Sequence, residues 1–544
     1  MDQLPQELVD RICRNLEAPD LKNTLLLSRK LQFSSEKYSG RFTRRVLRVS
    51  TAQKFIDTYS GHRLIYLQEV EFRPTFARLR QTSEKLPCRE SEDDIRQRDE
   101  SFSQQIQLLF NTLKTVEERA GRCAPGRLRL ALFSPTRMVD SEVCLHRRYV
   151  SWRVHLLAVD ALPKIHSIRA FEVYHGTSIN KIDKVNRTLF KLDYRVLIDL
   201  AAKFPSLEYL SCNIGGDEWG PPFEDEVAQH FMEEFPGPHR DTRHDFAKAL
   251  ETVILPKTLR KVQLDFLNPL SEIEGLDQRR SMPNLVDPAS RDPFSSSISL
   301  IARNLRKLQL RVVADESLFS DSGLDAFANI ESLDVMFHPM HPSGSWYFQG
   351  PQGEGADTVG HQIANSDYPP LKESDAETNF DYLLEDEGDR RSTTVPAEFR
   401  IVPIDDILVP LFTAFAKAAA TMTKLKEAAL WSYLMWEPGE LDVDYEPEDL
   451  VDAPAAGQQL GFGLQYLRPR EKVWYPRQGE DHSASRQIWW SVAKWRPDAT
   501  LHALCQDIGR RNHGDELVEY WTDPQYGECL VYQDRFMGMD VLRE

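Results

Sequence analysis

The hexapeptide "LRKLQL" (residues 305–310) carries apolar side chains at its first, fourth and sixth positions. Apolar residues that alternate with polar ones are typical of a strand that buries one of its faces. The same pattern, or a looser form of it, recurs in "IHSIRA" (165–170), "LEYLSC" (207–212), "LRKVQL" (259–264), "IESLDV" (330–335) and "LKEAAL" (425–430). The sequence therefore predicts a set of similar strands.

Apolar residues at helical spacing precede several of these strands. They step by 4, 3, 4 and 3 along residues 102–116, ahead of an alternating stretch at 128–132. Comparable patterns at 196–204 and 246–254 precede the strands predicted from residues 207 and 259. Helices that alternate with strands are typical of α/β folds, in which outer helices cover a parallel sheet. We therefore predict the α/β class.

The predicted strands resemble those of leucine-rich repeats, which stack strand and helix units into a solenoid. The intervals between the six copies are 42, 52, 46, 25 and 95 residues, whereas regular repeats hold near 20–29 residues. The resemblance therefore implies an irregular solenoid of parallel strands and outer helices. The alternative is an ordinary α/β domain whose strands share the pattern.

The first part of the chain, "LPQELVDRICRNLEAPDLKNTLLLSRKL" (residues 4–31), predicts a helical hairpin. Leu8, Ile12 and Leu16 follow one another at helical spacing, and Pro19 then interrupts the pattern. Asp20 suits the N-cap of a second helix, which would carry Leu21, Leu25 and Leu31. Because so small a hairpin cannot stabilise itself, its apolar faces must meet either another protein or, as a structural cap, the rest of the chain.

This stretch resembles an F-box. The Leu-Pro-x-Glu-Leu opening, the Ile and Leu one turn apart, the Asp-Leu start of the next helix and the Ser-Arg-x-bulky ending carry the resemblance, although Leu31 stands where the family often has Trp. The family implies binding to the Skp-type adaptor of cullin–RING ubiquitin ligases. The adaptor-binding residues that the resemblance implies are Leu4, Pro5, Glu7, Leu8, Ile12, Leu16, Leu21, Leu25, Ser28 and Leu31.

These patterns divide the chain into four parts: an F-box at 1–45, a leucine-rich-repeat-like α/β body at 46–338, an acidic disordered loop at 339–398, and a continuation and C-terminal cap of the body at 399–544. The loop is rich in Gly, Pro, Ser and acidic residues, with eight carboxylates within 373–389. Such a composition predicts a mobile segment that proteases cut first.

The charge balance disfavours two classes of partner. The chain holds 67 Lys and Arg residues against 84 Asp and Glu residues, a formal charge of −17, which repels nucleic acids and anionic membranes. No apolar run is long enough to span a bilayer, and the start of the chain lacks the pattern of a secretory signal. Seven scattered cysteines fit free thiols. We therefore expect a cytoplasmic or nuclear protein.

The sequence lacks the residue spacings that are typical of catalytic, metal-binding and cofactor-binding sites. No phosphate-binding loop, HExxH zinc motif or nucleophile elbow occurs, and "GFG" at 461–463 lacks the third glycine of a dinucleotide loop. Residues 437–452 hold eight carboxylates, but a calcium loop counted from Asp442 would place Pro447 where glycine is needed. We expect no cofactor, no metal and no catalysis; an enzyme built on the α/β body is the remaining alternative.

The sequence thus predicts a substrate-recognition subunit, similar to F-box proteins of filamentous fungi, with an unknown protein target. A scaffold that uses the hairpin without ubiquitin transfer is the alternative. Strand residues that alternate with the apolar positions should face solvent and contact the target; the principal ones are Tyr209, Lys261, Gln263, Lys307, Gln309, Arg311 and Asp334.

Three cations of this predicted face should lie close together. Lys261, Lys307 and Arg311 would form a basic stripe that accepts an acidic or phosphorylated target segment. The acidic residues 373–389 of the same chain could occupy the stripe in the absence of a target. The alternative is that the face is merely solvated.

Overall fold

The fold was analysed in a computed structural model of the chain. The structure describes residues 4–80, 86–121, 127–140, 143, 147, 152–175, 187–215, 235–268, 276–319, 324–372, 397–436, 459–471 and 484–521. None of the helices in these ranges combines the length and the apolar character that crossing a bilayer requires.

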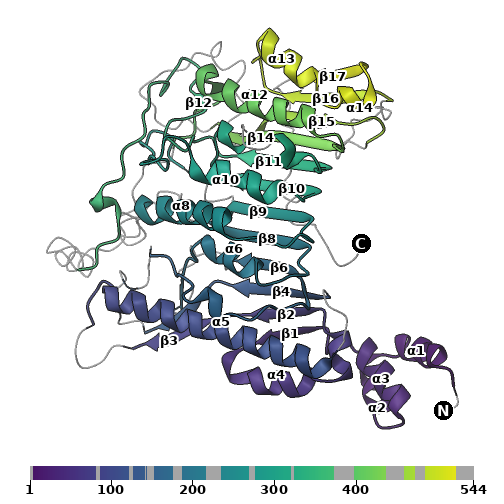
Figure 1. Cartoon of the computed structure of the whole chain (residues 1–544). Helices are drawn as coiled ribbons and strands as arrows, with labels where there is room; N and C mark the ends of the chain where they lie inside the picture. Colours follow the sequence, from purple (N-terminus) through teal and green to yellow (C-terminus); the bar gives the residue numbers. More distant parts are fainter. Residues whose placement is uncertain are drawn as a thin grey trace.

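One large sheet runs the length of the molecule (Figure 1). In spatial order its twelve strands are β1 (Arg44–Leu47), β2 (Glu69–Phe72), β4 (Leu128–Phe133), β6 (Ile168–Tyr174), β8 (Tyr209–Gly215), β9 (Lys261–Asn268), β10 (Lys307–Val312), β11 (Ser332–Phe337), β14 (Glu427–Met435), β15 (Gln459–Leu467), β16 (Arg486–Ser491) and β17 (Leu517–Trp521). Neighbouring strands pair in parallel, except that β15 runs antiparallel to β14 and β16. Two small sheets, β3–β5–β7 (Thr75–Leu79, Thr136–Val139, Arg187–Leu189) and β12–β13 (Phe348–Gln349, Val402–Pro403), lie beside it.

All six copies of the strand pattern form neighbouring strands of this sheet, from β6 to β14, as predicted. The register aligns equivalent positions: Leu308 pairs with Val262 on one side and with Leu333 on the other. Each strand begins two or three residues after the first apolar residue of its motif, and that residue, such as Leu305, is buried in the turn before the strand. The α/β class is thereby confirmed.

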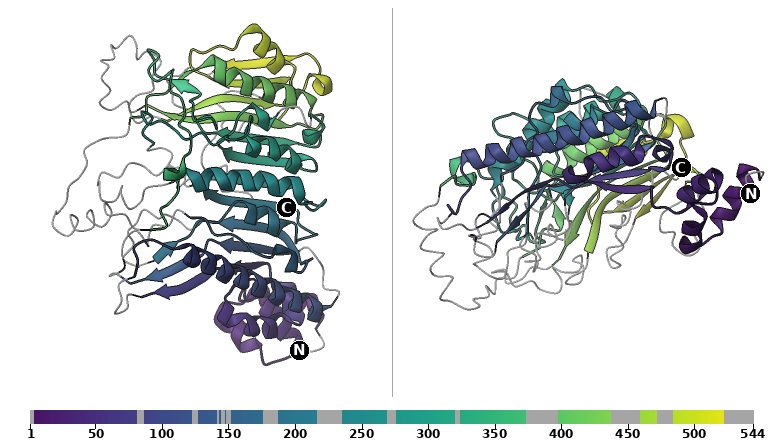
Figure 2. Two further views of the ribbon diagram at one scale, coloured as in Figure 1. Left: turned by 60° about the vertical axis from the view of Figure 1, so that its left-hand side comes forward. Right: turned by 90° about the horizontal axis from the view of Figure 1, so that it is seen from below.

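Helices cover one face of the sheet (Figures 1 and 2). They are α4 (Ala52–Tyr59), α5 (Glu92–Ala120), α6 (Arg195–Ala201), α8 (Pro236–Thr252), α10 (Pro293–Ala302), α12 (Asp405–Thr421) and α13 (Ala499–Gln506). Local chemistry sets several helix starts: Ser91 and Asp94 form a capping box for α5, and Asp292 accepts the first backbone N–H groups of α10. Phe110, Leu197, Phe246 and Phe412 from these helices join the strand side chains in one continuous core.

A second layer covers part of the other face of the sheet. Residues 276–285 and 336–346, the ends of β9 and β10 and the middle of β14 form an apolar cluster that contains Leu267, Leu276, Met282, Leu285, Val313, Met336, Met340, Trp346, Ala429, Trp431 and Tyr433. Buried Arg400 ties this layer together, because its guanidinium donates to the carbonyl oxygens of Gln278, Phe348 and Gly355 at 3.1, 3.1 and 2.8 Å. It also lies over the ring of Trp346.

The prediction of a disordered loop over 339–398 is therefore wrong for residues 339–372. Met340, Trp346, Tyr347 and Phe348 are almost fully buried, and their apolar surface offsets the cost of ordering a segment that has no regular periodicity. The acidic residues 373–396, and the carboxylate run at 437–452, lie outside the described residues.

Residues 4–38 form a small unit of three helices at one end of the sheet (Figure 1). They are α1 (Gln6–Arg14), α2 (Ala18–Thr24) and α3 (Arg29–Tyr38), and they pack around Val9, Cys13, Leu21 and Leu31. The predicted two-helix hairpin is thus wrong in one respect. The second helix is split because Ser28 caps a new one, its hydroxyl accepting from the Leu31 backbone N–H at 3.3 Å. Helix α2 begins at Ala18, before Asp20, because proline is tolerated in a first turn.

Candidate functional site

The helical unit exposes large apolar side chains that its own core does not use. Leu8 and Ile12, one turn apart on α1, are 46% and 45% exposed, and Leu26 and Leu27 between α2 and α3 are 96% and 59% exposed. We call these four residues the N-terminal apolar surface. Large apolar side chains exposed in this number on a unit this small make it a candidate for contact with another molecule.

The structure divides the ten residues implied by the F-box resemblance into two groups. Leu21 and Leu31 are buried in the core of the unit, and Leu4, Leu16, Leu25 and Ser28 are half-buried. Pro5, Glu7, Leu8 and Ile12 are exposed. Leu26 and Leu27 were missed by the sequence analysis, although three consecutive leucines cannot all enter one small core.

Buried Glu36 at the end of α3 joins the helical unit to the body. Its carboxylate accepts hydrogen bonds from Arg63 Nε at 3.0 Å and Nη2 at 2.6 Å, and lies 2.9 Å from His62 Nε2. Burial raises its pKa, but these hydrogen bonds outweigh burial and hold the pKa of Glu36 below its usual value. The Tyr66 hydroxyl also donates to the Phe33 carbonyl at 3.0 Å. We call these five residues the α3–η2 joint, since His62, Arg63 and Tyr66 belong to η2 (His62–Tyr66).

The strand positions predicted to contact a target do share one face of the sheet, as their register shows. They are not solvent-exposed as expected, however. Five of the seven are buried: Tyr209, Gln263, Gln309, Arg311 and Asp334. Ser211, Asp265, Ser332 and Met336, at alternating positions of the same strands, are buried as well. Met336 lies beneath the second layer, and neighbouring side chains satisfy one another elsewhere. The Tyr209 hydroxyl donates to Gln263 at 2.9 Å, and Trp431 Nε1 donates to Asp334 at 3.0 Å.

The predicted basic stripe is reduced to two lysines. Arg311 is buried and pairs with Asp265 at 3.4 Å, so its charge is neutralised. Lys261 and Lys307 are half-buried and directly opposite each other on β9 and β10. The Lys307 side chain forms no ion pair or hydrogen bond with a described residue. Beside it, the buried Gln309 Oε1 has no hydrogen-bond partner in the described part of the chain.

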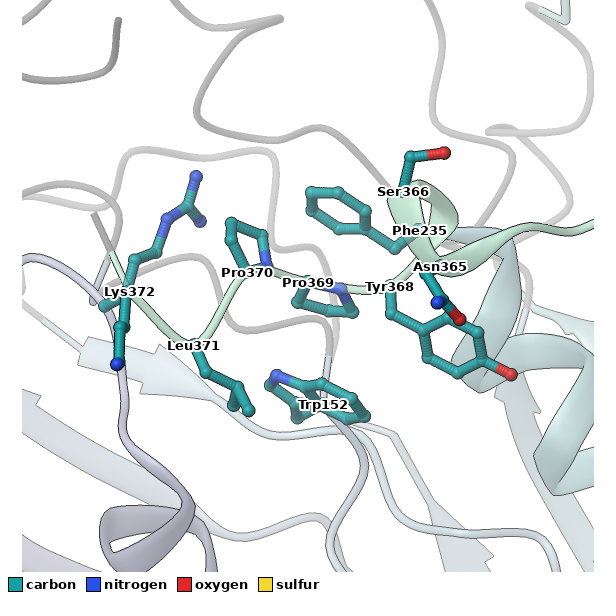
Figure 3. A pocket seen from close by; sticks show the side chains of 10 residues that line it. Trp152, Phe235, Asn365, Ser366, Tyr368, Pro369, Pro370, Leu371 and Lys372 are labelled. Carbon is teal, nitrogen blue, oxygen red and sulfur yellow. The ribbon is translucent and has the colours of Figure 1, made fainter. Parts of the chain in front are cut away.

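A groove of about 780 Å³ lies at the start of α8 (Figure 3). Three segments distant in sequence line it: Trp152, Phe235 and the stretch from Asn365 to Lys372, together with Arg89. The rings of Trp152 and Tyr368 lie 6.1 Å apart at an interplanar angle of 30°. The sequence offered no periodic signal for this groove, because no two of its aromatic residues share an element.

Three possible metal ligands come together on the helix side of the second layer. Ligand atoms of Asp315, Glu316 and His341 lie within 4.8 Å of one another. Two of the three already have hydrogen-bond partners: Asp315 accepts from the Ser317 backbone N–H and hydroxyl, and His341 Nδ1 lies 2.8 Å from the Ser343 hydroxyl. We assign no metal to this cluster.

Asp315 has a pKa that predicts a measurable pH effect. Burial, with Asp292 nearby, raises the pKa of Asp315 to about 6, so the folded state retains a proton that the unfolded state releases above about pH 4. The contribution of Asp315 to the free energy of unfolding is therefore fully present below pH 4 and is lost as pH rises through 6. Asp315→Asn keeps an acceptor for Ser317 but cannot ionise. We expect its free energy of unfolding to match the parent's at pH 4 and to exceed it by about 1–3 kcal/mol at pH 7.5.

Urea unfolding at both pH values measures this difference. A gap between Asp315→Asn and the parent that does not change with pH would contradict the assignment of the raised pKa. Asp367→Asn, at a half-buried carboxyl, is the matched control.

Comparison with known proteins adds no assignment: no protein-family model matches the chain, and no curated protein matches it.

Proposed function

We propose that this chain is a non-catalytic substrate-recognition subunit of a Skp–cullin–F-box ubiquitin ligase. The helical unit, as an F-box, binds the Skp-type adaptor, and the sheet body, as an irregular leucine-rich-repeat-like solenoid, binds the target protein. The N-terminal apolar surface is the observation that carries the proposal. Complete burial of an exposed leucine or isoleucine side chain contributes about 1.5–3 kcal/mol, so covering the exposed parts of these four residues would favour complex formation.

Features of the body support the second half of the proposal. Strand–helix units repeat along the sheet, and equivalent motif positions stay in register from β8 to β11. The helices leave the opposite face to polar side chains, where Lys261 and Lys307 are partly accessible. Cys13, Cys212 and Cys505 are buried free thiols, as expected for the reducing environment of the cytoplasm or nucleus.

Reconstitution tests the proposal. The full-length chain, mixed with a purified Skp-type adaptor, should elute with it as a stable complex from a gel-filtration column. With the cullin, the RING subunit, charged conjugating enzyme and ubiquitin added, captured targets should gain ubiquitin. No complex with the adaptor would overturn the proposal, whereas a complex that transfers no ubiquitin to any captured protein would favour the scaffold alternative.

Lys307 allows a test of the target-binding face. Lys307→Glu should reduce target capture about tenfold, because it places a carboxylate beside the acidic target segment, equivalent to about 1.4 kcal/mol. Its stability should be nearly unchanged, since the ammonium group has no described partner to lose. Quantitative mass spectrometry of co-purified proteins measures the change. Arg311 is unsuitable because its loss would leave the buried Asp265 carboxylate without a compensating cation.

Lys257→Glu, which makes the same charge change at an exposed lysine in the turn before β9, provides the control. Equal recovery of the same proteins by the parent and by both variants would place target recognition elsewhere on the body.

A further inference from the structure

The groove at the start of α8 has one wall that is held rigidly. The Tyr368 hydroxyl accepts from Arg240 Nη2 at 2.6 Å and donates to Asp241 Oδ2 at 2.8 Å. Its ring lies against Gly237 of α8, where a Cβ atom would come within 2.7 Å of three ring carbons. Only glycine therefore allows the ring to pack so closely. A wall fixed in this way costs little conformational entropy when a ligand binds.

The floor and sides of the groove are apolar. Trp152 faces Tyr368, and Pro369, Pro370 and Leu371 continue the apolar lining along one side (Figure 3). Phe235 lies across from them. Aromatic and proline rings are rigid and bury a large area, so they favour a flat or bulky apolar group over a flexible polar one.

The end of the groove near Leu371 is polar and cationic. The indole nitrogen of Trp152 lies on this side of its ring (Figure 3); it is buried and has no hydrogen-bond partner among the described residues. A buried donor without an acceptor costs about 1–3 kcal/mol, which a ligand oxygen would recover. Lys372 is exposed at the same end, and Arg89 also lines the groove. All three side chains suit a carboxylate, which accepts charge-assisted hydrogen bonds.

We propose that this groove binds a peptide segment of the target protein in which an aromatic side chain is followed by an acidic residue. The aromatic ring of the peptide lies between Trp152 and the two prolines, Pro369 and Pro370. The carboxylate of the peptide accepts a hydrogen bond from Trp152 Nε1 and pairs with Lys372. The volume of about 780 Å³ exceeds that of one side chain, which leaves room for neighbouring peptide residues. This inference rests on the proposed function, because it names the class of target that the subunit would recognise. The binding test itself does not depend on that function.

The test uses the full-length chain without adaptor and three peptides that carry 4-fluorophenylalanine or no aromatic residue. They are acetyl-Gly-(4-fluoro-Phe)-Asp-Gly-amide, its Asn counterpart, and acetyl-Gly-Ala-Asp-Gly-amide as an unlabelled competitor. Fluorine NMR line broadening gives the dissociation constants. We expect the Asp peptide to bind at least fivefold more tightly than the Asn peptide, and the Ala peptide not to compete.

Variants locate the binding. Trp152→Phe keeps an aromatic ring but removes the hydrogen-bond donor. This variant and Lys372→Gln should each weaken binding of the Asp peptide at least threefold and leave binding of the Asn peptide almost unchanged. Lys257→Gln should change neither. The proposal would be overturned if the parent bound the Asp and Asn peptides with equal affinity. It would also be overturned if both groove variants bound the Asp peptide as tightly as the parent.

The outcome is separable from that of the proposed function. All groove residues lie outside the helical unit, so adaptor binding by Lys372→Gln and Trp152→Phe should equal that of the parent. A chain that binds adaptor but no peptide refutes the groove alone, and a chain that binds peptide but no adaptor refutes the ligase assignment alone.

Discussion

Replacing Leu8 and Ile12 together by alanine is expected to weaken binding of the Skp-type adaptor by a factor of about 100 or more, while the melting temperature of the chain stays within about 1 °C of the parent's. Truncation of apolar anchors at the centre of an interface typically costs 2 kcal/mol or more for each residue, and 1.4 kcal/mol corresponds to a factor of ten. The stability of the folded chain should stay nearly unchanged, because both side chains are nearly half exposed and neither belongs to the core of the helical unit.

Two controls separate loss of contact from loss of structure. Ile254→Ala removes an 86% exposed isoleucine beyond the end of α8, and it should affect neither adaptor binding nor stability. Val9→Ala removes a buried side chain of the unit and should lower both. Adaptor affinity by isothermal calorimetry and melting by circular dichroism give the two measurements. Intact adaptor binding with a large loss of stability in Leu8→Ala/Ile12→Ala would indicate a structural cap instead.

Arg243→Met is expected to cost the largest free energy of any single substitution considered. Arg243 Nη2 donates to Asp292 at 2.6 Å, and both side chains are almost fully buried. The pair joins α8 to α10, and Arg243 also donates to the Val313 carbonyl at the end of β10. Removal of one partner leaves the other charge buried and uncompensated, which typically costs about 3–5 kcal/mol. Urea unfolding at pH 7 should show this loss.

A double variant tests the cause. Asp292→Asn keeps an oxygen that can accept from the first turn of α10 but carries no charge. Arg243→Met/Asp292→Asn should therefore lose less stability than the sum of the losses of Arg243→Met and Asp292→Asn measured singly, by a coupling free energy within the usual range of about 0.5–3 kcal/mol for neighbouring residues. Strict additivity of the two single changes would show that packing, and not charge, accounts for the loss.

The elements that the sequence predicted well are those whose pattern is local. The strands β6 to β14 and the helices α5, α6 and α8 follow from apolar spacing over six to fifteen residues, which tertiary context left intact.

What the sequence could not predict depends on contacts between distant segments. Tyr209 and Arg311 are polar at alternating strand positions, yet they are buried, because Gln263 and Asp265 on β9 satisfy them. Polar character therefore did not indicate exposure. The second layer was missed because residues 339–372 have no period, and the groove was missed because Trp152, Phe235 and Tyr368 meet only in the folded chain.

The α3–η2 joint has a consequence for the reach of the molecule. Neighbouring strands lie about 4.8 Å apart, so the eleven spacings of the sheet add up to about 50 Å between β1 and β17. The contacts of Glu36 with Arg63 and His62 connect the helical unit to the near end of this sheet, so a change of angle at the joint moves the far end by the largest distance. A rotation of about 10° at the joint would carry the far end through about 9 Å, roughly the spacing of two strands. The contacts of Glu36 with Arg63 and His62, together with the hydrogen bond from Tyr66 to Phe33, therefore set the orientation of the whole sheet relative to the helical unit.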